Sequence, residues 1–171
     1  TIVNADTLSG KYTVSLDDQG PFIAEVNAEG YFFTNLPIVF SGDSTLIIRN
    51  IELQKMSAGS KIVVENILFD TGKATLLPQS FTELNKLARL LIENESIRIE
   101  VSGHTDNTGS AAINKRLSRS RAESVRNYLI EKGVDGMRMQ FEGYGFDRPI
   151  ESNDTAAGRA ANRRVEIEVI E

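Results

Sequence analysis

Residues 97–109 read IRIEVSGHTDNTG, and this stretch decides the fold of the second part of the chain. Its first half alternates the apolar residues Ile97, Ile99 and Val101 with polar ones, which is the pattern of a half-buried β-strand. The polar loop from Gly103 to Gly109 then leads directly into a long helical segment. A loop of this kind lies beside the free backbone N–H groups of the first helical turn. It is therefore either a capped strand–helix turn or a ligand site with Asp106 as its acid.

The segments around this stretch predict helices packed on a sheet. Strand-like alternation occurs over residues 62–69, 138–144 and 164–170, and helical spacing occurs over residues 78–94 and 110–132. Gly133 ends the second helical segment. The order strand–helix–strand–helix–strand–strand predicts an α+β fold with a mixed sheet, formed by a domain at residues 61–171.

Residues 1–57 have a different pattern of apolar and turn-forming residues. Short β-branched or aromatic runs alternate with Gly and Asp turns, and they cover residues 12–16, 22–26, 31–33, 36–40 and 45–53, with a turn signal at residues 17–21. This spacing predicts a small antiparallel β-sandwich, joined to the second domain by a linker at residues 57–60. The region is short for a sandwich, and the chain begins at Thr1 without Met or a signal-like segment. We therefore expect a piece of a longer protein, with strands upstream.

Composition excludes several classes of function. The 171 residues include no cysteine and one histidine, which excludes disulfide scaffolds, thiolate nucleophiles and cysteine metal sites. The net charge of −5 argues against nucleic acid as a partner. Residues 1–60 hold three bases and seven acids, so the first region carries −4 and the remainder −1. No apolar run reaches the length of about 20 residues that spans a bilayer.

Known catalytic and cofactor motifs are absent as well. Position 67 is Ile and position 74 is Ala, so Gly72-Lys73 does not complete a phosphate-binding loop. Gly143-Tyr144-Gly145 lacks the third glycine of a dinucleotide fingerprint, and no G-x-S-x-G nucleophile elbow occurs. His104 and Asp106 are too few for a zinc site. We therefore expect neither a cofactor nor a metal.

The second helical segment contains an anomaly. A helical wheel started at Ile113 gathers the apolar residues over an arc of about 160°. Its members are Ile113, Leu117, Val125, Tyr128 and Leu129. On the same wheel, Arg121 at about 80° and Asn114 at about 100° from Ile113 fall inside this arc. A buried arginine needs a partner, so Arg121 either forms a structural ion pair or aims its guanidinium at a carboxylate-bearing ligand.

Four ordered blocks carry a resemblance to a known family. They are Gly103-His104-Thr105-Asp106 with Asn114, Leu117-Ser118 and Arg121-Ala122; Phe69-Asp70 with Gly72, Ala74, Leu76 and Pro78; Gly143-Tyr144-Gly145 with Pro149; and Asn153, Thr155, Gly158-Arg159 and Asn162 to Glu166. Over residues 61–171 the chain resembles the OmpA-like peptidoglycan-binding domain of outer-membrane proteins, peptidoglycan-associated lipoproteins and flagellar stators.

The resemblance implies a non-catalytic module that binds the stem peptide of the cell wall. In the family, the residues that match Asp106 and Arg121 bind the ammonium and the carboxylate of diaminopimelate. The same pocket is implied for Asn114, Leu117, Phe69, Asp70, Asn107 and Thr108. Of Arg163 and Arg164, we expect one to support the site and the other to form a surface ion pair. The family commonly has an aromatic residue where this chain has Ile113.

A fainter resemblance covers the first region. Ser9-Gly10-Lys11-Tyr12, Leu16 and Glu29-Gly30-Tyr31 resemble the end of a carboxypeptidase-regulatory-like β-sandwich, which implies a spacer or a contact with envelope proteins. Together the resemblances imply a periplasmic protein that tethers the envelope to peptidoglycan, associated with the outer membrane through a part outside this chain. Two alternatives stay open. One is a hydrolase that uses Asp106, Asp70 or Glu142 as general acid or base, and the other is an assembly module without a ligand.

Overall fold

A computed structural model describes residues 2–16, 21–39 and 46–171, and the chain divides into two compact units. The first unit comprises Thr1–Val26 and Thr34–Glu52, and the second comprises Asn27–Phe33 and Leu53–Glu171. The predicted domain boundary between residues 57 and 61 is not tested by this division and stays a prediction.

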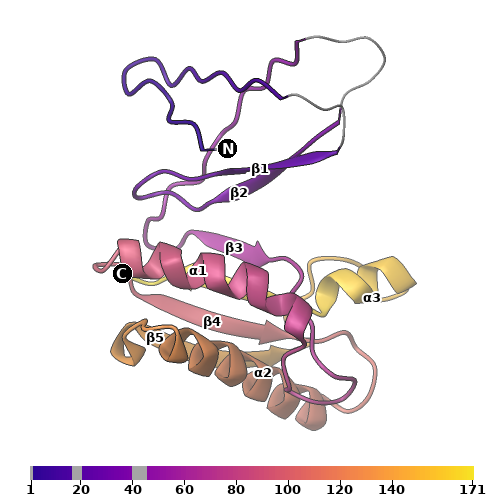
Figure 1. Cartoon of the computed structure of the whole chain (residues 1–171). Helices are drawn as coiled ribbons and strands as arrows, with labels where there is room; N and C mark the ends of the chain where they lie inside the picture. Colours follow the sequence, from indigo (N-terminus) through magenta and orange to yellow (C-terminus); the bar gives the residue numbers. More distant parts are fainter. Residues whose placement is uncertain (1, 17–20, 40–45) are drawn as a thin grey trace. The chain divides into compact units, whose positions relative to one another are not determined.

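The first unit contains one antiparallel hairpin, drawn in indigo and violet in Figure 1. Strands β1 (Phe22–Val26) and β2 (Thr34–Ile38) pair so that Phe22 lies opposite Ile38 and Val26 opposite Thr34. Described residues 2–16 and 46–52 form no strand, although their alternation predicts two. The predicted turn at residues 17–20, and residues 40 and 45 of the other predicted strands, lie outside the described residues.

The second unit is a four-stranded mixed sheet covered by helices on one face, as the sequence predicts. Its elements are β3 (Lys61–Val64), the 3₁₀ turn η1 (Pro78–Ser80), α1 (Phe81–Glu93), β4 (Ile99–His104), α2 (Ala111–Glu131), the 3₁₀ turn η2 (Gly136–Arg138), β5 (Met139–Gly145), α3 (Ala156–Asn162) and β6 (Val165–Val169). The strand order is β3-β6-β4-β5; β4 and β5 are parallel, and the other pairs are antiparallel.

The core lies between the helices and one face of this sheet. The strands contribute Ile99, Val101, Met139, Val165, Ile167 and Val169, and α1 and α2 contribute Leu84, Leu87, Leu91, Ala122, Val125 and Leu129. The intervening strand residues, such as Glu100, Glu166 and Glu168, are polar and lie on the opposite face. The sequence alternation therefore reports the two faces correctly.

Two glycines let α2 lie directly on the strands. A Cβ atom at Gly103 of β4 would lie 2.1 Å from the carbonyl oxygen of Ser118, and one at Gly143 of β5 would lie 2.1 Å from the backbone nitrogen of Arg119. Any larger residue would push the helix away. This close packing places the part of α2 around Ser118 and Arg119 against the last residues of β4 and β5.

Three details differ from the sequence prediction. The strand predicted over residues 62–69 ends at Val64, because Asn66 turns the backbone with a φ of 59°, and Phe69 pairs only with Leu76 in an isolated bridge. The helix predicted to start at Pro78 begins with a 3₁₀ turn and becomes α-helical at Phe81. A short additional helix, α3, precedes β6.

Candidate functional site

The candidate site lies at the end of β4, in the loop that leads into α2. The backbone N–H of Thr105 donates to the carbonyl of Gly145 at 2.8 Å, which joins the loop to the end of β5. Ser110 caps α2 and accepts a hydrogen bond from the N–H of Ile113. Asp106 lies between these two anchors and is buried.

Asp106 is held by two donors. Its Oδ2 accepts a hydrogen bond from Nη1 of Arg163 at 2.7 Å, and its Oδ1 accepts one from the backbone N–H of Thr108 at 2.9 Å. Burial alone would raise the pKa of Asp106, but the hydrogen bonds from Arg163 and Thr108 outweigh it, so that the pKa lies below its usual value. Asp106 is therefore a fixed carboxylate at neutral pH.

Arg121 lies on α2 at the edge of the same site. Its Nε donates to the carbonyl of Lys73 at 3.0 Å, and its guanidinium lies over the Phe69 ring at 4.9 Å from the centroid. Burial lowers the pKa of Arg121, the charge of Arg163 lowers it further, and Asp106 opposes both. Within the described part of the chain, Arg121 has no carboxylate in ion-pair contact.

The wheel prediction for α2 is partly wrong. Ile113 is 56% exposed, and the buried residues of α2 are Asn114, Ser118, Ala122, Val125 and Leu129. The buried arc is thus centred about 140° from Ile113. Arg121 and Leu117 are half-buried at its flank. The missing aromatic residue at position 113 therefore leaves an exposed side chain and removes nothing from the core.

Asn114 ties the loop to the helix. Its side-chain amide donates to the carbonyl of Thr108 at 3.0 Å and to that of Asp106 at 3.4 Å, and the residue is buried. Among the residues predicted from the sequence, Asn114 and Thr108 therefore shape the loop that carries Asp106.

Phe69 and Asp70 belong to a separate turn that meets α2. The side chain of Asp70 lies 3.4 Å from Nζ of Lys73, and its carbonyl accepts from the Lys73 N–H at 3.0 Å. This turn presents the Lys73 carbonyl to Arg121. The structure thus brings Phe69 to Arg121, whereas Asp70 acts within its own turn.

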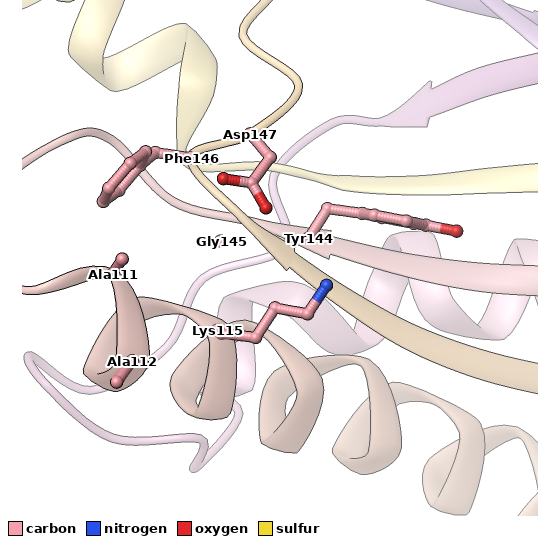
Figure 2. A pocket seen from close by; sticks show the side chains of 7 residues that line it. All are labelled: Ala111, Ala112, Lys115, Tyr144, Gly145, Phe146 and Asp147. Atoms are coloured by element: carbon pink, nitrogen blue, oxygen red, sulfur yellow. The ribbon is translucent and has the colours of Figure 1, made fainter.

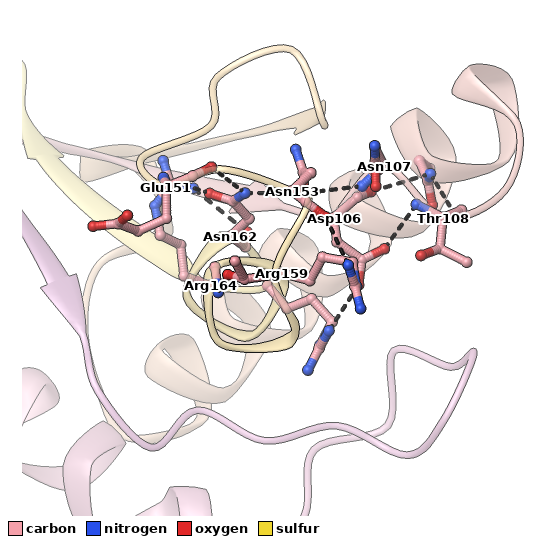
Figure 3. A network of polar contacts seen from close by, with 12 residues as sticks. Asp106, Asn107, Thr108, Glu151, Asn153, Arg159, Asn162 and Arg164 are labelled. Carbon is pink, nitrogen blue, oxygen red and sulfur yellow. Dashed lines mark hydrogen bonds and ion pairs between the residues drawn. The ribbon is translucent and has the colours of Figure 1, made fainter.

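A polar network behind the loop was not predicted as part of the site. Figure 3 shows it around Asn162, which is completely buried. Its amide donates to Oδ1 of Asn153 at 3.0 Å, and the same oxygen accepts from the N–H of Asn107 at 3.3 Å. Asn153 and Asn162 belong to the fourth block of the resemblance, and this is the sequence signal from which the network could have been predicted.

The two neighbouring arginines at the end of α3 have different roles. Arg163 reaches Asp106, as described above. Arg164 is buried and pairs with Glu166 through Nε at 2.6 Å, and it also donates to the carbonyl of Arg148. The expectation of a surface ion pair is therefore wrong for Arg164, because the pair is enclosed beneath the loop.

A shallow hollow of about 260 Å³ lies on the other side of the first turn of α2 (Figure 2). Its walls include Lys115, Tyr144, Phe146 and Asp147. Both Lys115 and Arg148 lie over the Tyr144 ring, at 5.3 and 3.5 Å from its centroid. Neither Asp106 nor Arg121 lines this hollow.

In the ranges that the structure describes, no three His, Asp or Glu side chains gather closely enough to hold a metal ion. Of the described helices, none has the length and apolar character needed to cross a membrane.

Comparisons with known proteins agree with this fold. The chain is 43% identical over 113 residues to the probable lipoprotein YiaD of Escherichia coli, which covers 64% of the chain and 52% of that protein. It is 45% identical over 103 residues to the peptidoglycan-binding protein ArfA of Mycobacterium bovis, covering 60% of the chain and 32% of that protein. The chain thus spans about half or less of these relatives.

A solved structure supports the same assignment. The periplasmic domain of MotB from Helicobacter pylori superimposes with a TM-score of 0.59 at 25% identity, covering 68% of this chain and 79% of that one. The model of the OmpA family matches residues 68–163, a range that begins just before Phe69 and ends at Arg163. The chain described here therefore belongs to the OmpA family.

Proposed function

We propose that residues 61–171 bind peptidoglycan without covalent chemistry, through the diaminopimelate of the stem peptide. The observation that carries this proposal is the pair of opposite charges at one site: a fixed Asp106 carboxylate and an Arg121 guanidinium without a carboxylate partner among the described residues. The similarity to ArfA, a peptidoglycan-binding protein, supports it.

The chemistry of the side chain of diaminopimelate fits these two groups. Its terminal carbon bears an ammonium and a carboxylate. Asp106 accepts the ammonium through the lone pairs that Arg163 and Thr108 leave unused, because each carboxylate oxygen can accept two hydrogen bonds. Among the described residues, Arg121 forms a hydrogen bond only through Nε, so its outer nitrogens are available for the carboxylate.

The same geometry favours diaminopimelate over lysine. Lysine has the ammonium but lacks the terminal carboxylate, so Arg121 would remain partly desolvated without a partner. Leaving one member of a buried charge pair unsatisfied costs about 2–5 kcal/mol, and the half-exposed position of Arg121 puts the expected cost at the low end.

The other predicted residues support this pair. Phe69 provides a flat surface under the guanidinium. Asn114 and Thr108 fix the Asp106 loop, and Arg163 orients the carboxylate. We include Leu117 as an apolar wall and Asn107 as a rim residue, while Asp70 contributes by shaping the turn that positions Arg121.

We infer an anchoring role in the cell envelope from this binding. The domain would hold the outer membrane or an envelope complex to the cell wall from the periplasm, with membrane attachment through a part outside this chain. Relatives with names such as probable lipoprotein support that placement. For residues 1–57 we propose a carboxypeptidase-regulatory-like β domain that acts as a spacer or contacts envelope proteins.

A hydrolase is the weaker alternative. A general acid needs a raised pKa near the working pH. The N–H of Gly143 and the Arg119 side chain, at 2.9 Å, hold the pKa of Glu142 below its usual value although burial opposes them. The pKa of Asp106 is lowered too, despite its burial. Neither Asp106 nor Glu142 is tuned as a general acid, which argues against that role for these two residues.

An assembly module without a ligand is the other alternative. It would use Arg121 as a structural ion pair. Arg121 contacts a carbonyl and an aromatic ring instead. This arrangement positions the guanidinium and, within the described ranges, leaves it without a carboxylate in contact, which supports a ligand carboxylate.

Calorimetric titration of the full chain with meso-diaminopimelate and with lysine tests the proposal. We expect binding of diaminopimelate only, and at least a tenfold loss of affinity in Asp106→Ala and in Arg121→Ala. Arg116→Ala is the matched control, because Arg116 lies on the exposed side of α2. Far-UV circular dichroism checks that each variant is folded. Undiminished binding in folded Arg121→Ala would refute the site.

A further inference from the structure

The site contains one more guanidinium than a zwitterion requires. Arg163 donates to Asp106 at 2.7 Å, and Arg121 lies close enough for the charge of Arg163 to lower the pKa of its guanidinium. The three side chains carry two positive charges and one negative charge. A ligand group with one ammonium and one carboxylate neutralises Asp106 and Arg121 but leaves Arg163 with only a shared partner.

Arg163 is free to make a further contact. Of its guanidinium nitrogens, only Nη1 is hydrogen-bonded to a described residue, and its side chain is 48% exposed. Its remaining N–H donors have no partner among the described residues. A guanidinium has five donors in a rigid fork, so one arm can stay on Asp106 while the other takes a second acceptor.

The backbone holds Arg163 in a defined place. It follows Asn162, which is completely buried and bonded to Asn153, and its N–H donates to the carbonyl of Arg159 at 3.2 Å. The side chain therefore extends from a fixed point at the end of α3 toward the loop. A group that is placed in advance loses less conformational entropy when it binds a ligand.

Resting on the proposed function, we propose that Arg163 selects ligands with a second carboxylate next to the bound zwitterion, namely stem peptides that end at diaminopimelate. Diaminopimelate has two amino acid centres. One carries the zwitterion bound by Asp106 and Arg121, and the other lies in the peptide chain. The carboxyl group of the second centre is charged only when no further residue follows and it is not amidated.

A matched pair of ligands tests this assignment. One is the tripeptide L-alanyl-γ-D-glutamyl-meso-diaminopimelate with a free carboxylate at its chain end, and the other is the same tripeptide amidated at that carboxyl group only. Both keep the zwitterion. Calorimetric titrations of the full chain give the ratio of the two affinities, and we expect the free acid to bind about fivefold more tightly, as suits a half-exposed charged contact.

Three variants locate the residue that produces the difference in affinity between the two ligands. Arg163→Gln removes the charge and should bring the ratio close to one. Arg116→Gln removes the same charge from the exposed side of α2 and should leave the ratio near five. Arg163→Lys keeps the charge without the fork and should retain part of the preference.

The possible results separate this inference from the proposed function. A wild-type ratio near one overturns the role of Arg163, and so does an unchanged ratio in folded Arg163→Gln, even if that variant binds both ligands more weakly. Failure of the wild-type chain to bind either tripeptide overturns the proposed function, and this inference with it.

Discussion

The side-chain amide of Asn162 donates to Oδ1 of Asn153 at 3.0 Å, and this contact joins the last residue of α3 to the segment between β5 and α3. The same Asn153 oxygen accepts the N–H of Asn107, next to Asp106 (Figure 3). Asn162 also accepts from the N–H groups of Ile150 and Glu151. The position of the binding loop therefore depends on residues more than 40 positions further along the chain.

Replacing Asn153 should weaken ligand binding more than folding. Asn153→Ala removes the shared acceptor and leaves the N–H of Asn107 without its partner. We therefore expect a three- to tenfold loss of affinity for diaminopimelate, and a loss of less than about 1 kcal/mol in the free energy of unfolding. Asn162→Ala should cost about 2–3 kcal/mol, because it removes four hydrogen bonds made by a completely buried side chain. Titration and urea unfolding measure both effects.

The control for this pair is Asn127→Ala, since Asn127 lies exposed on α2. It should change neither quantity. Full affinity in Asn153→Ala would contradict the idea that this residue positions the loop.

Because α2 lies so close to β5, a larger residue at Gly143 should lower the stability of the protein. Gly143→Ala would place a Cβ atom 2.1 Å from a backbone nitrogen and 2.6 Å from the Ser118 hydroxyl. The helix must shift, and we expect a loss of at least about 2 kcal/mol in the free energy of unfolding.

Gly136→Ala is its control in the same unit. There the nearest atoms, at 3.0 and 3.1 Å, are the ends of the Ile130 and Arg126 side chains, which can move. The change should stay within about 1 kcal/mol. Equal stability of the two variants in urea unfolding would show that the helix tolerates displacement.

The sequence predicts the second unit well because its periodicity reports burial. Alternation in β4 and β6 matches their two faces, and the helical spacing of α1 matches its buried residues. Alternation does not report pairing, which is why residues 12–16 form no strand despite their pattern. Alternation also does not show where the backbone turns, so it does not predict the turn at Asn66 that ends the strand.

The site was predictable only in part. Arg121 stands out because a charge interrupts an apolar stripe, although it lies at the flank of the buried arc and not inside it, where the wheel predicts it. The pairing of Arg163 with Asp106 spans 57 residues and has no signature in local spacing. Contacts of this kind depend on how α3 meets the loop, which only the tertiary structure specifies.

Replacing Phe32 should destabilise the core of the second unit. Phe32 lies before the predicted linker, yet it is 3% exposed and belongs to the core of the second unit. Phe32→Ala should destabilise that unit by about 3–5 kcal/mol. Tyr12→Ala, at a 44% exposed aromatic residue, is the control and should have a small effect. Unfolding of the full chain followed by hydrogen exchange in α1 would detect the difference.

His104 should make stability depend on pH. It is 2% exposed, and neither ring nitrogen has a hydrogen-bond partner within the described residues. Burial lowers the pKa of His104 to about 4; the charges of Arg164, Arg148 and Lys61 act in the same direction, and Glu166 opposes them. The unfolded chain binds this proton near pH 6.5, so the folded state loses stability as the pH falls from about 6.5 to 4.

The expected size of this effect is up to about 3 kcal/mol, from the difference between the two pKa values. Urea unfolding between pH 7 and pH 4 measures it. In His104→Gln the side chain does not titrate, so the decline should be shallower by that amount. Parallel pH profiles for the two proteins would mean that His104 becomes protonated without cost in the folded state.

Binding of diaminopimelate should survive acidification until Asp106 itself is protonated. Despite its burial, the hydrogen bonds from Arg163 and Thr108 keep the pKa of Asp106 below the ordinary value of 3.8. The carboxylate that accepts the ammonium is therefore present throughout the range above about pH 4, and affinity should fall only below it. Arg163→Gln removes the largest stabilising contact of that carboxylate, so burial should raise the pKa of Asp106 and move the loss of binding to higher pH. Titrations at pH 3.5–7 compare the two midpoints, with Arg116→Gln as the control for net charge, and an identical midpoint in Arg163→Gln would show that Arg163 does not hold the charge of Asp106.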